Sequence, residues 1–157
     1  MKKFELTAES KINIFGKKLF RIKALISFGD VEEGETGGWI EKEENLEQSS
    51  GDAWVYGDAE VYGDAWVYGN ARVSGNARVS GNAEVYGNAD YTTIHGFGTQ
   101  FRTTTFFQCE DKQIRVSCGC FLGTIPEFRE QVKNTREGKI AEEYLMIADL
   151  MEKHFVK

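Results

Sequence analysis

Hydrophobic positions recur every six residues in the middle of the chain, between residues 51 and 90. Each six-residue unit holds one valine, an alanine four residues later, and a Gly-Asp or Gly-Asn pair directly before that alanine. Because side chains alternate along a strand, an inward valine leaves both neighbours pointing outward, and Gly with Asp or Asn suits the corner that follows. With three units to a turn, the repeat predicts a parallel β-helix. The valines are Val55, Val61, Val67, Val73, Val79 and Val85.

The segment before the repeat shows two other patterns. Alternating apolar residues on both sides of Gly16 predict a β-hairpin, with Ile12 and Ile14 on one strand and residues 20–24 on the other. Eight acidic residues then crowd into residues 30–47. We expect this stretch to form an irregular acidic segment that leads into the repeat.

The segment after the repeat changes from strand to helix. Apolar residues over 101–116 predict further strands, which continue to about Cys120. Thr124 and Glu127 form a capping box that predicts the start of a helix, and a second amphipathic stripe runs over residues 144–155. We expect a mainly β fold in one compact domain. Its three parts are an N-terminal hairpin with the acidic segment at residues 1–50, a β-helix at residues 51–122, and a pair of helices at residues 123–157.

Residues 18 positions apart should lie above one another, which gives the repeat three outward faces. One face carries Trp66, Tyr68, Glu84 and Tyr86. Aromatic enrichment is typical of interfaces, so we predict that this face binds a partner or a second copy of the chain. The alternative is that aromatic residues only suit strands and cover their neighbours. Secondary binding candidates are Trp54, Tyr56, Arg72, Arg78, Glu41, Glu43 and Glu44.

The same stacking predicts two contacts between neighbouring turns of the repeat. Glu60 should meet Arg78, and Tyr68 should stack on Tyr86, since the members of each pair are 18 residues apart. Each contact would stabilise the fold by about 0.2–1 kcal/mol.

The acidic composition limits the classes of partner. The formal net charge is −6, so we expect no general binding to nucleic acid. No apolar run is long enough to span a bilayer, and Lys2-Lys3 is not followed by a signal-peptide core. We therefore expect a cytoplasmic protein with no membrane interaction. The cysteines Cys109, Cys118 and Cys120 are odd in number and close together, which predicts reduced thiols.

The phrase Val-x-Gly-Asp/Asn-Ala resembles the hexapeptide repeat of left-handed β-helix proteins, with Val55 and Ala59 in the first and fifth places. It departs from that pattern at the second place, which holds Tyr or Ser in this chain. The resemblance implies a left-handed β-helix. It also implies a homo-oligomer, with a trimer favoured, because proteins of this family are often trimers. The family includes acyltransferases and γ-class carbonic anhydrases, but a fold alone does not carry an activity.

Short motifs outside the repeat extend the resemblance over nearly all 157 residues. They are Phe28-Gly29-Asp30-Val31, Gly37-Gly38-Trp39-Ile40, Glu44-Asn45-Leu46, Gly119-Cys120-Phe121, Gly123-Thr124, Glu127-Phe128 and Glu143-Tyr144. With them, the chain resembles a group of small hexapeptide-repeat proteins of bacteriophages and prophages, often described as polymer-forming or transferase-like. This resemblance implies a phage origin and a partner in the bacterial host cell, but no particular reaction.

Catalytic and metal-binding groups are scarce. An acyltransferase of this family uses a histidine as general base, and His95 is the candidate, with Asp90 as the nearest carboxylate in sequence. A γ-class carbonic anhydrase needs three histidines for each zinc ion, and this chain has two. The three cysteines with His95 would make four zinc ligands, but their spacing is not typical of zinc sites. We assign no metal and no cofactor.

These observations favour a non-catalytic binding protein that engages a bacterial host component. The expected component is a host protein, such as a defence enzyme that is inhibited, or a signalling nucleotide. One alternative is an acyltransferase with His95 as base, which predicts acyl-CoA binding and loss of activity in His95→Ala. Another is a self-assembling structural protein, which predicts fibres in electron micrographs. The sequence leans away from an enzyme without excluding one.

Overall fold

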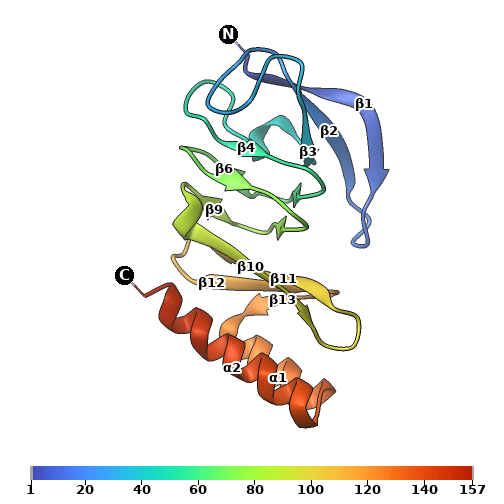
Figure 1. Ribbon diagram of the computed structural model, residues 1–157, viewed down its shortest axis with the longest axis vertical. Coiled ribbons are helices and arrows are strands. Elements are labelled where there is room, and N and C mark those ends of the chain that lie inside the picture. The colour runs from blue at the N-terminus through green and yellow to red at the C-terminus, as the bar shows by residue number, and fades with distance from the viewer. Residues whose placement is uncertain (1, 157) are drawn as a thin grey trace.

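The computed structural model describes residues 2–156 and arranges them in layers along one long axis (Figure 1). β1 (Phe4–Ile12) and β2 (Lys18–Ala24) form an antiparallel hairpin beside the upper layers. Gly16 lies in the turn with a φ of +79°, which glycine adopts without strain. The predicted hairpin is confirmed, except that Ile14 lies in the turn and not on the first strand. β3 (Thr36–Ile40) continues this sheet by pairing antiparallel with β2.

The repeat forms six strands of two residues each, and every strand pairs in parallel with the one 18 residues away. The predicted register between repeats is therefore confirmed. β3 also pairs in parallel with β5, so that β1, β2, β3, β5 and β8 form one five-stranded mixed sheet. The pairs are β4 (Trp54–Val55) with β7 (Arg72–Val73), β5 (Glu60–Val61) with β8 (Arg78–Val79), and β6 (Trp66–Val67) with β9 (Glu84–Val85).

Small side chains fill the interior of the repeat. All six valines are fully buried, and the alanines from Ala53 to Ala83 are at most 1% exposed. They form one hydrophobic cluster with Phe4, Ile22 and Ile40 from the N-terminal strands. The hairpin and the repeat therefore share a single core.

The C-terminal part contains an antiparallel sheet covered by two helices (Figure 1). The helices bury a second hydrophobic cluster, which includes Phe106, Phe128 and Tyr144, against this sheet. Two single turns of 3-10 helix, η1 (Glu43–Asn45) and η2 (Asn88–Asp90), lie before and after the repeat. The sheet consists of β10 (Tyr91–Phe97), β11 (Arg102–Gln108), β12 (Ile114–Cys118) and β13 (Phe121–Thr124), and the helices are α1 (Ile125–Thr135) and α2 (Gly138–His154).

The predicted capping box starts α1. The backbone N–H of Thr124 donates to Glu127 Oε1 over 2.8 Å, and the backbone N–H of Glu127 donates to Thr124 Oγ1 over 3.3 Å. The amphipathic stripe of α2 also faces inward as predicted, with Tyr144, Ile147 and Met151 buried. Neither helix, nor any other in residues 2–156, has the length and apolar character needed to cross a bilayer.

The predicted fold class, a short left-handed parallel β-helix over residues 51–122, is wrong. The strands form several small sheets, one mixed, one antiparallel and two of only two strands, and do not form a regular solenoid. Residues 91–124 belong to the antiparallel sheet because short turns join each strand to the next, and a short turn can only link antiparallel neighbours. The architecture is therefore a set of small sheets followed by two C-terminal helices.

Candidate binding surface

Three aromatic rings from neighbouring strands contact one another on one face of the repeat. Trp66 and Tyr68 flank the buried Val67, so both side chains leave the chain on its outer side. Their rings stack, with centroids 3.8 Å apart and planes inclined by 13°. Tyr86 meets Tyr68 edge-on, with centroids 5.0 Å apart. The predicted contact between the two tyrosines is formed, but as an edge contact, and Trp66 is the ring that stacks.

We call Trp66, Tyr68, Glu84 and Tyr86 the aromatic face. Trp66 is 38% exposed and Tyr86 is 60% exposed, which is unusual for large aromatic side chains. Glu84 is the register partner of Trp66 between β6 and β9. The four residues predicted to bind a partner thus lie together on a solvent-facing surface.

The acidic segment before the repeat folds against the same surface. Glu43, Glu44 and Glu47, which we call the acidic turn, line a hollow of about 390 Å³ together with Trp66. From the sequence, the aromatic and acidic residues are separate candidates. The structure brings Glu43 and Glu44 to the edge of the aromatic face, where carboxylates and an exposed indole line one hollow.

Asn45 fixes the acidic turn to the repeat. Its amide nitrogen donates to the carbonyls of Gly63 and Ala65, over 3.2 and 2.9 Å. Its Oδ1 accepts from the backbone N–H groups of Glu41 and Lys42, over 3.1 and 2.9 Å. Asn45 is fully buried, so these bonds satisfy polar atoms that would otherwise destabilise the fold. The acidic turn is therefore held in place by a buried amide.

The acidic turn carries negative charge. The backbone N–H and the hydroxyl of Ser49 donate to Glu47 Oε1 over 3.0 and 2.7 Å, and these bonds lower the pKa of Glu47. Glu43 pairs with Lys2 at 3.1 Å, an exposed pair of the kind that contributes about 0–1 kcal/mol. Glu44 is exposed and forms no ion pair within residues 2–156. Neither Glu44 nor Glu47 forms a salt bridge within residues 2–156, although the Lys3 ammonium lies near enough to help lower the pKa of Glu47.

Trp54 is completely buried, so the prediction that it points outward and binds a partner is wrong. Phe4 of β1 and Phe28 meet its indole edge-on, with centroids 6.2 and 5.3 Å away. Tyr56, on the same face of the repeat, is half-buried against this cluster. The N-terminal segments therefore cover this face with the protein's own side chains.

The hairpin covers the next face of the repeat. Glu60 is only 7% exposed and pairs with Lys11 of β1 at 3.0 Å. The predicted ion pair between Glu60 and Arg78 is therefore not formed, although the two residues are register partners. Tyr62 is buried beside Phe15, with ring centroids 6.1 Å apart. The aromatic face differs in that two of its large aromatic side chains, Trp66 and Tyr86, stay exposed.

Two further candidates are held by contacts within the protein. Arg72 pairs with Asp30. Glu41 Oε1 accepts from the backbone N–H of Gly63 over 2.8 Å. Both side chains serve to connect the N-terminal segments to the repeat, and a partner would have to break these contacts to use them.

His95 lies exposed in β10. Asp90, the nearest carboxylate in sequence, is buried, and Asp90 Oδ2 accepts from the backbone N–H groups of Tyr86 and Gly87 over 2.9 and 3.2 Å. These bonds direct that carboxylate oxygen to the backbone near η2. These two hydrogen bonds of Asp90 go to backbone groups and not to the His95 imidazole.

The cysteines are distributed between different surroundings. Cys109 is buried in the cluster of the repeat, Cys118 is buried in the cluster beneath the helices, and Cys120 is exposed. Across residues 2–156, no three His, Cys, Asp or Glu side chains gather in a group that could hold a metal ion. Burial raises the pKa of the Cys109 thiol to about 11, so this sulfur is protonated at neutral pH.

The fold and the surface define a mainly β protein that presents stacked aromatic rings beside a cluster of carboxylates. The sequence matches no protein-family model and no curated protein. Sequence reasoning does not place Leu46, Glu47 or Gln48 at a binding site, although they complete the hollow beside Trp66. The density of acidic residues over 30–47 is a signal for Glu47 alone.

Proposed function

We propose that this protein is a non-catalytic binding protein whose aromatic face and acidic turn bind a basic segment of a partner protein. The observation that carries the proposal is the position of Trp66, which stacks on Tyr68 and lines one hollow with Glu43, Glu44 and Glu47. An exposed indole beside carboxylates matches the chemistry of a cationic side chain. The aliphatic part of an arginine or lysine would lie on the indole, and its charged end would reach the carboxylates.

The interactions that this surface offers favour binding of an arginine-rich or lysine-rich segment. A cation over the face of a tryptophan contributes about 0.5–1 kcal/mol at an exposed site. The carboxylates add orientation and a faster rate of encounter with a positively charged partner. The signalling nucleotide expected from the phage resemblance carries phosphates, which the acidic turn would repel. A basic protein segment therefore fits this surface better than a nucleotide.

The test uses a fluorescent oligo-arginine peptide and measures its binding by anisotropy at low salt. We expect Trp66→Ala to weaken binding by about fivefold, since a loss near 1 kcal/mol corresponds to that factor. Phe101→Ala is the matched control, because Phe101 is 70% exposed and lies outside the aromatic face. Glu44→Gln should also weaken binding, whereas Glu142→Gln, on the exposed side of α2, should not.

Equal affinities for Trp66→Ala, Glu44→Gln and their controls would overturn the proposal. Analytical ultracentrifugation distinguishes binding of a partner protein from self-association. The hexapeptide-repeat resemblance predicts self-association in the form of a trimer. An oligomer that dissociates in Trp66→Ala would show that a second copy of the chain occupies the face. A host defence protein as the natural partner is a further proposal from the phage resemblance, and co-purification of such a protein by the wild type but not by Trp66→Ala would support it.

A further inference from the structure

The seven arginines of this acidic chain fall into two groups. Four form ion pairs with carboxylates: Arg21, Arg72, Arg115 and Arg129. The other three, Arg78, Arg102 and Arg136, are half-buried and form no ion pair within residues 2–156. Arg102 and Arg136 line one cavity, and Arg102 and Arg78 line a second, so the two cavities share Arg102 as a lining residue. The arginines without a counter-charge are therefore concentrated in one region.

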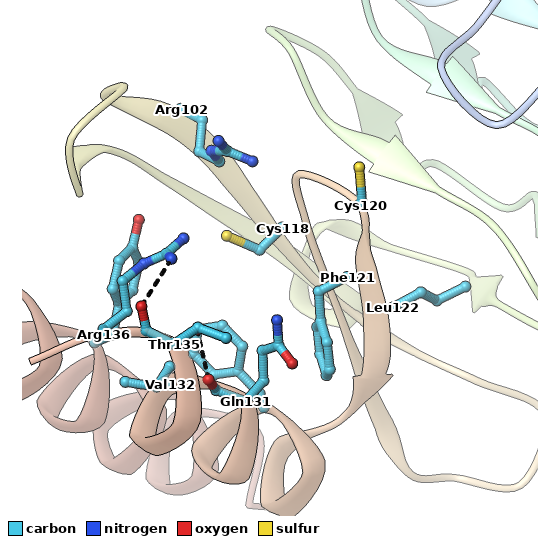
Figure 2. A pocket seen from close by; sticks show the side chains of 11 residues that line it. Arg102, Cys118, Cys120, Phe121, Leu122, Gln131, Val132, Thr135 and Arg136 are labelled. Carbon is cyan, nitrogen blue, oxygen red and sulfur yellow. Dashed lines mark hydrogen bonds between the residues drawn. The ribbon is translucent and has the colours of Figure 1, made fainter.

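The larger cavity, of about 450 Å³, lies between the hairpin β12–β13 and the two helices (Figure 2). Arg102 enters it from the start of β11 and Arg136 from the end of α1, and Figure 2 draws the Cys118 thiol between them. Gln131 and Thr135 of α1 add polar groups, while Phe121 forms part of an apolar wall. No carboxylate lines this cavity.

Arg102 is positioned by a glycine. Gly119 has a φ of +60° in the turn between β12 and β13, and a Cβ at this position would overlap the Arg102 guanidinium. Arg102 Nη2 also donates to Gln100 Oε1 over 3.2 Å. The guanidinium thus lies directly over the turn and borders both cavities.

The second cavity, of about 370 Å³, continues from Arg102 toward the repeat. Arg78 lies on its wall with Asn76, and the exposed Phe101 and Ile14 form apolar parts of its lining. This cavity also has no carboxylate among its lining residues, although the chain has 25 acidic residues. The region therefore favours a negatively charged ligand in an otherwise acidic protein.

We infer that these two cavities, which share Arg102 as a lining residue, bind a small organic phosphate. Guanidinium groups match phosphate oxygens with two parallel N–H donors, and such charge-assisted bonds are stronger than those between neutral groups. More than one half-buried arginine suits a ligand with more than one negative charge. The cavity volumes are within the range of small-molecule sites, which are about 300–1,000 Å³, and the phenylalanine side chains suit an apolar or planar part of the ligand.

Isothermal titration calorimetry of the full chain with pyrophosphate and with adenosine diphosphate tests this inference. We expect both to bind, with adenosine diphosphate about tenfold tighter because only it also contacts the apolar wall. Arg102→Gln and Arg136→Gln should each weaken binding by about tenfold or more. Arg102→Lys should retain part of the affinity, because it keeps the charge but loses the planar pair of donors.

Lys133→Gln is the matched control, since Lys133 is an exposed cation on α1 outside the cavity. It should bind like the wild type, and thermal melts of all variants establish that each is folded. Absence of binding by the folded wild type at millimolar ligand would overturn the inference, as would equal losses in Lys133→Gln and Arg136→Gln. Equal affinity for pyrophosphate and adenosine diphosphate would contradict the inference that the ligand carries an organic group. None of these outcomes bears on the aromatic face.

Discussion

Gly119 and Arg102 fit together so closely that the glycine hydrogen occupies the space where a side chain would meet the guanidinium. The φ of +60° at Gly119 also belongs to the left-handed region, where other residues are strained. Two separate constraints therefore favour glycine in the turn between β12 and β13. One concerns the backbone, and the other concerns the place of a charged group.

Gly119→Ala should separate these two constraints. We expect it to lower the free energy of unfolding by about 1–2 kcal/mol through backbone strain and to weaken pyrophosphate binding through displacement of Arg102. Gly75→Ala is the control, because Gly75 has a φ of +67° and open space around it. The control should lose similar stability in urea denaturation but keep its affinity for pyrophosphate. Unchanged affinity in Gly119→Ala would contradict the positioning of Arg102 by this glycine.

Two tryptophans in equivalent places of the repeat should differ in their contribution to stability. Trp54→Ala leaves a large cavity in the core and should cost about 3–5 kcal/mol. Trp66→Ala removes an exposed side chain and should cost about 0.5–1.5 kcal/mol, mainly through loss of its stacking on Tyr68. Urea denaturation of both variants measures this difference. Similar losses of stability in the two variants would contradict the burial of Trp54 in the core.

Glu60 should hold the hairpin against the repeat. Its carboxylate pairs with Lys11 at 3.0 Å and accepts from Asn13 Nδ2 over 3.2 Å, and it is nearly buried. Glu60→Ala removes hydrogen bonds to a charged group and should cost about 1–3 kcal/mol. The amides of residues 11–18 should then exchange hydrogen faster. Glu9→Ala, which removes the exposed partner of Arg21, should cost at most about 1 kcal/mol.

Stability should fall at high pH because of Cys109. Burial raises the pKa of this thiol from its ordinary value of 9.0 to about 11, so above pH 9 the unfolded chain loses a proton that the folded protein keeps. The folded state therefore binds more protons, and its stability decreases by about 2 kcal/mol between pH 9 and pH 11. Buried tyrosines such as Tyr62 and Tyr144, whose pKa values are also raised by burial, add to this decrease.

Cys109→Ala isolates the contribution of the thiol. Between pH 9 and pH 11, the free energy of unfolding of this variant should fall less steeply than that of the wild type. The substitution also changes stability by an amount that does not depend on pH, and this amount does not affect the slope. Urea denaturation at several pH values measures both slopes. Identical slopes would show that the thiol does not titrate differently in the folded and unfolded states.

Local patterns of the sequence predict local structure well in this protein. The six-residue period gives the 18-residue register of the parallel pairs, and Thr124 with Glu127 marks the start of α1. Both features depend on residues close in sequence or on a strict repeat. The fold class fails because the repeat supplies only two-residue strands, whereas longer strands such as β1 and β11 come from the flanks and pair antiparallel.

Contacts between distant segments set the limits for predicting the sites. The four residues of the aromatic face follow from the repeat alone. Nothing near Trp54 in sequence indicates that Phe28 covers it, and nothing near Glu60 indicates Lys11 as its partner. The arginine-lined cavities are equally hidden, because Arg102 and Arg136 come together only when α1 packs on the antiparallel sheet.

The valine and alanine interior of the repeat separates the packing of the protein from its recognition of other molecules. The interior side chains are fully buried and leave the outward positions to contact solvent, the flanking segments or a partner. A substitution at Tyr86, which is 60% exposed, changes the surface and leaves the buried valines and alanines in place. The outward surface can therefore change during evolution one residue at a time, while the same scaffold is inherited.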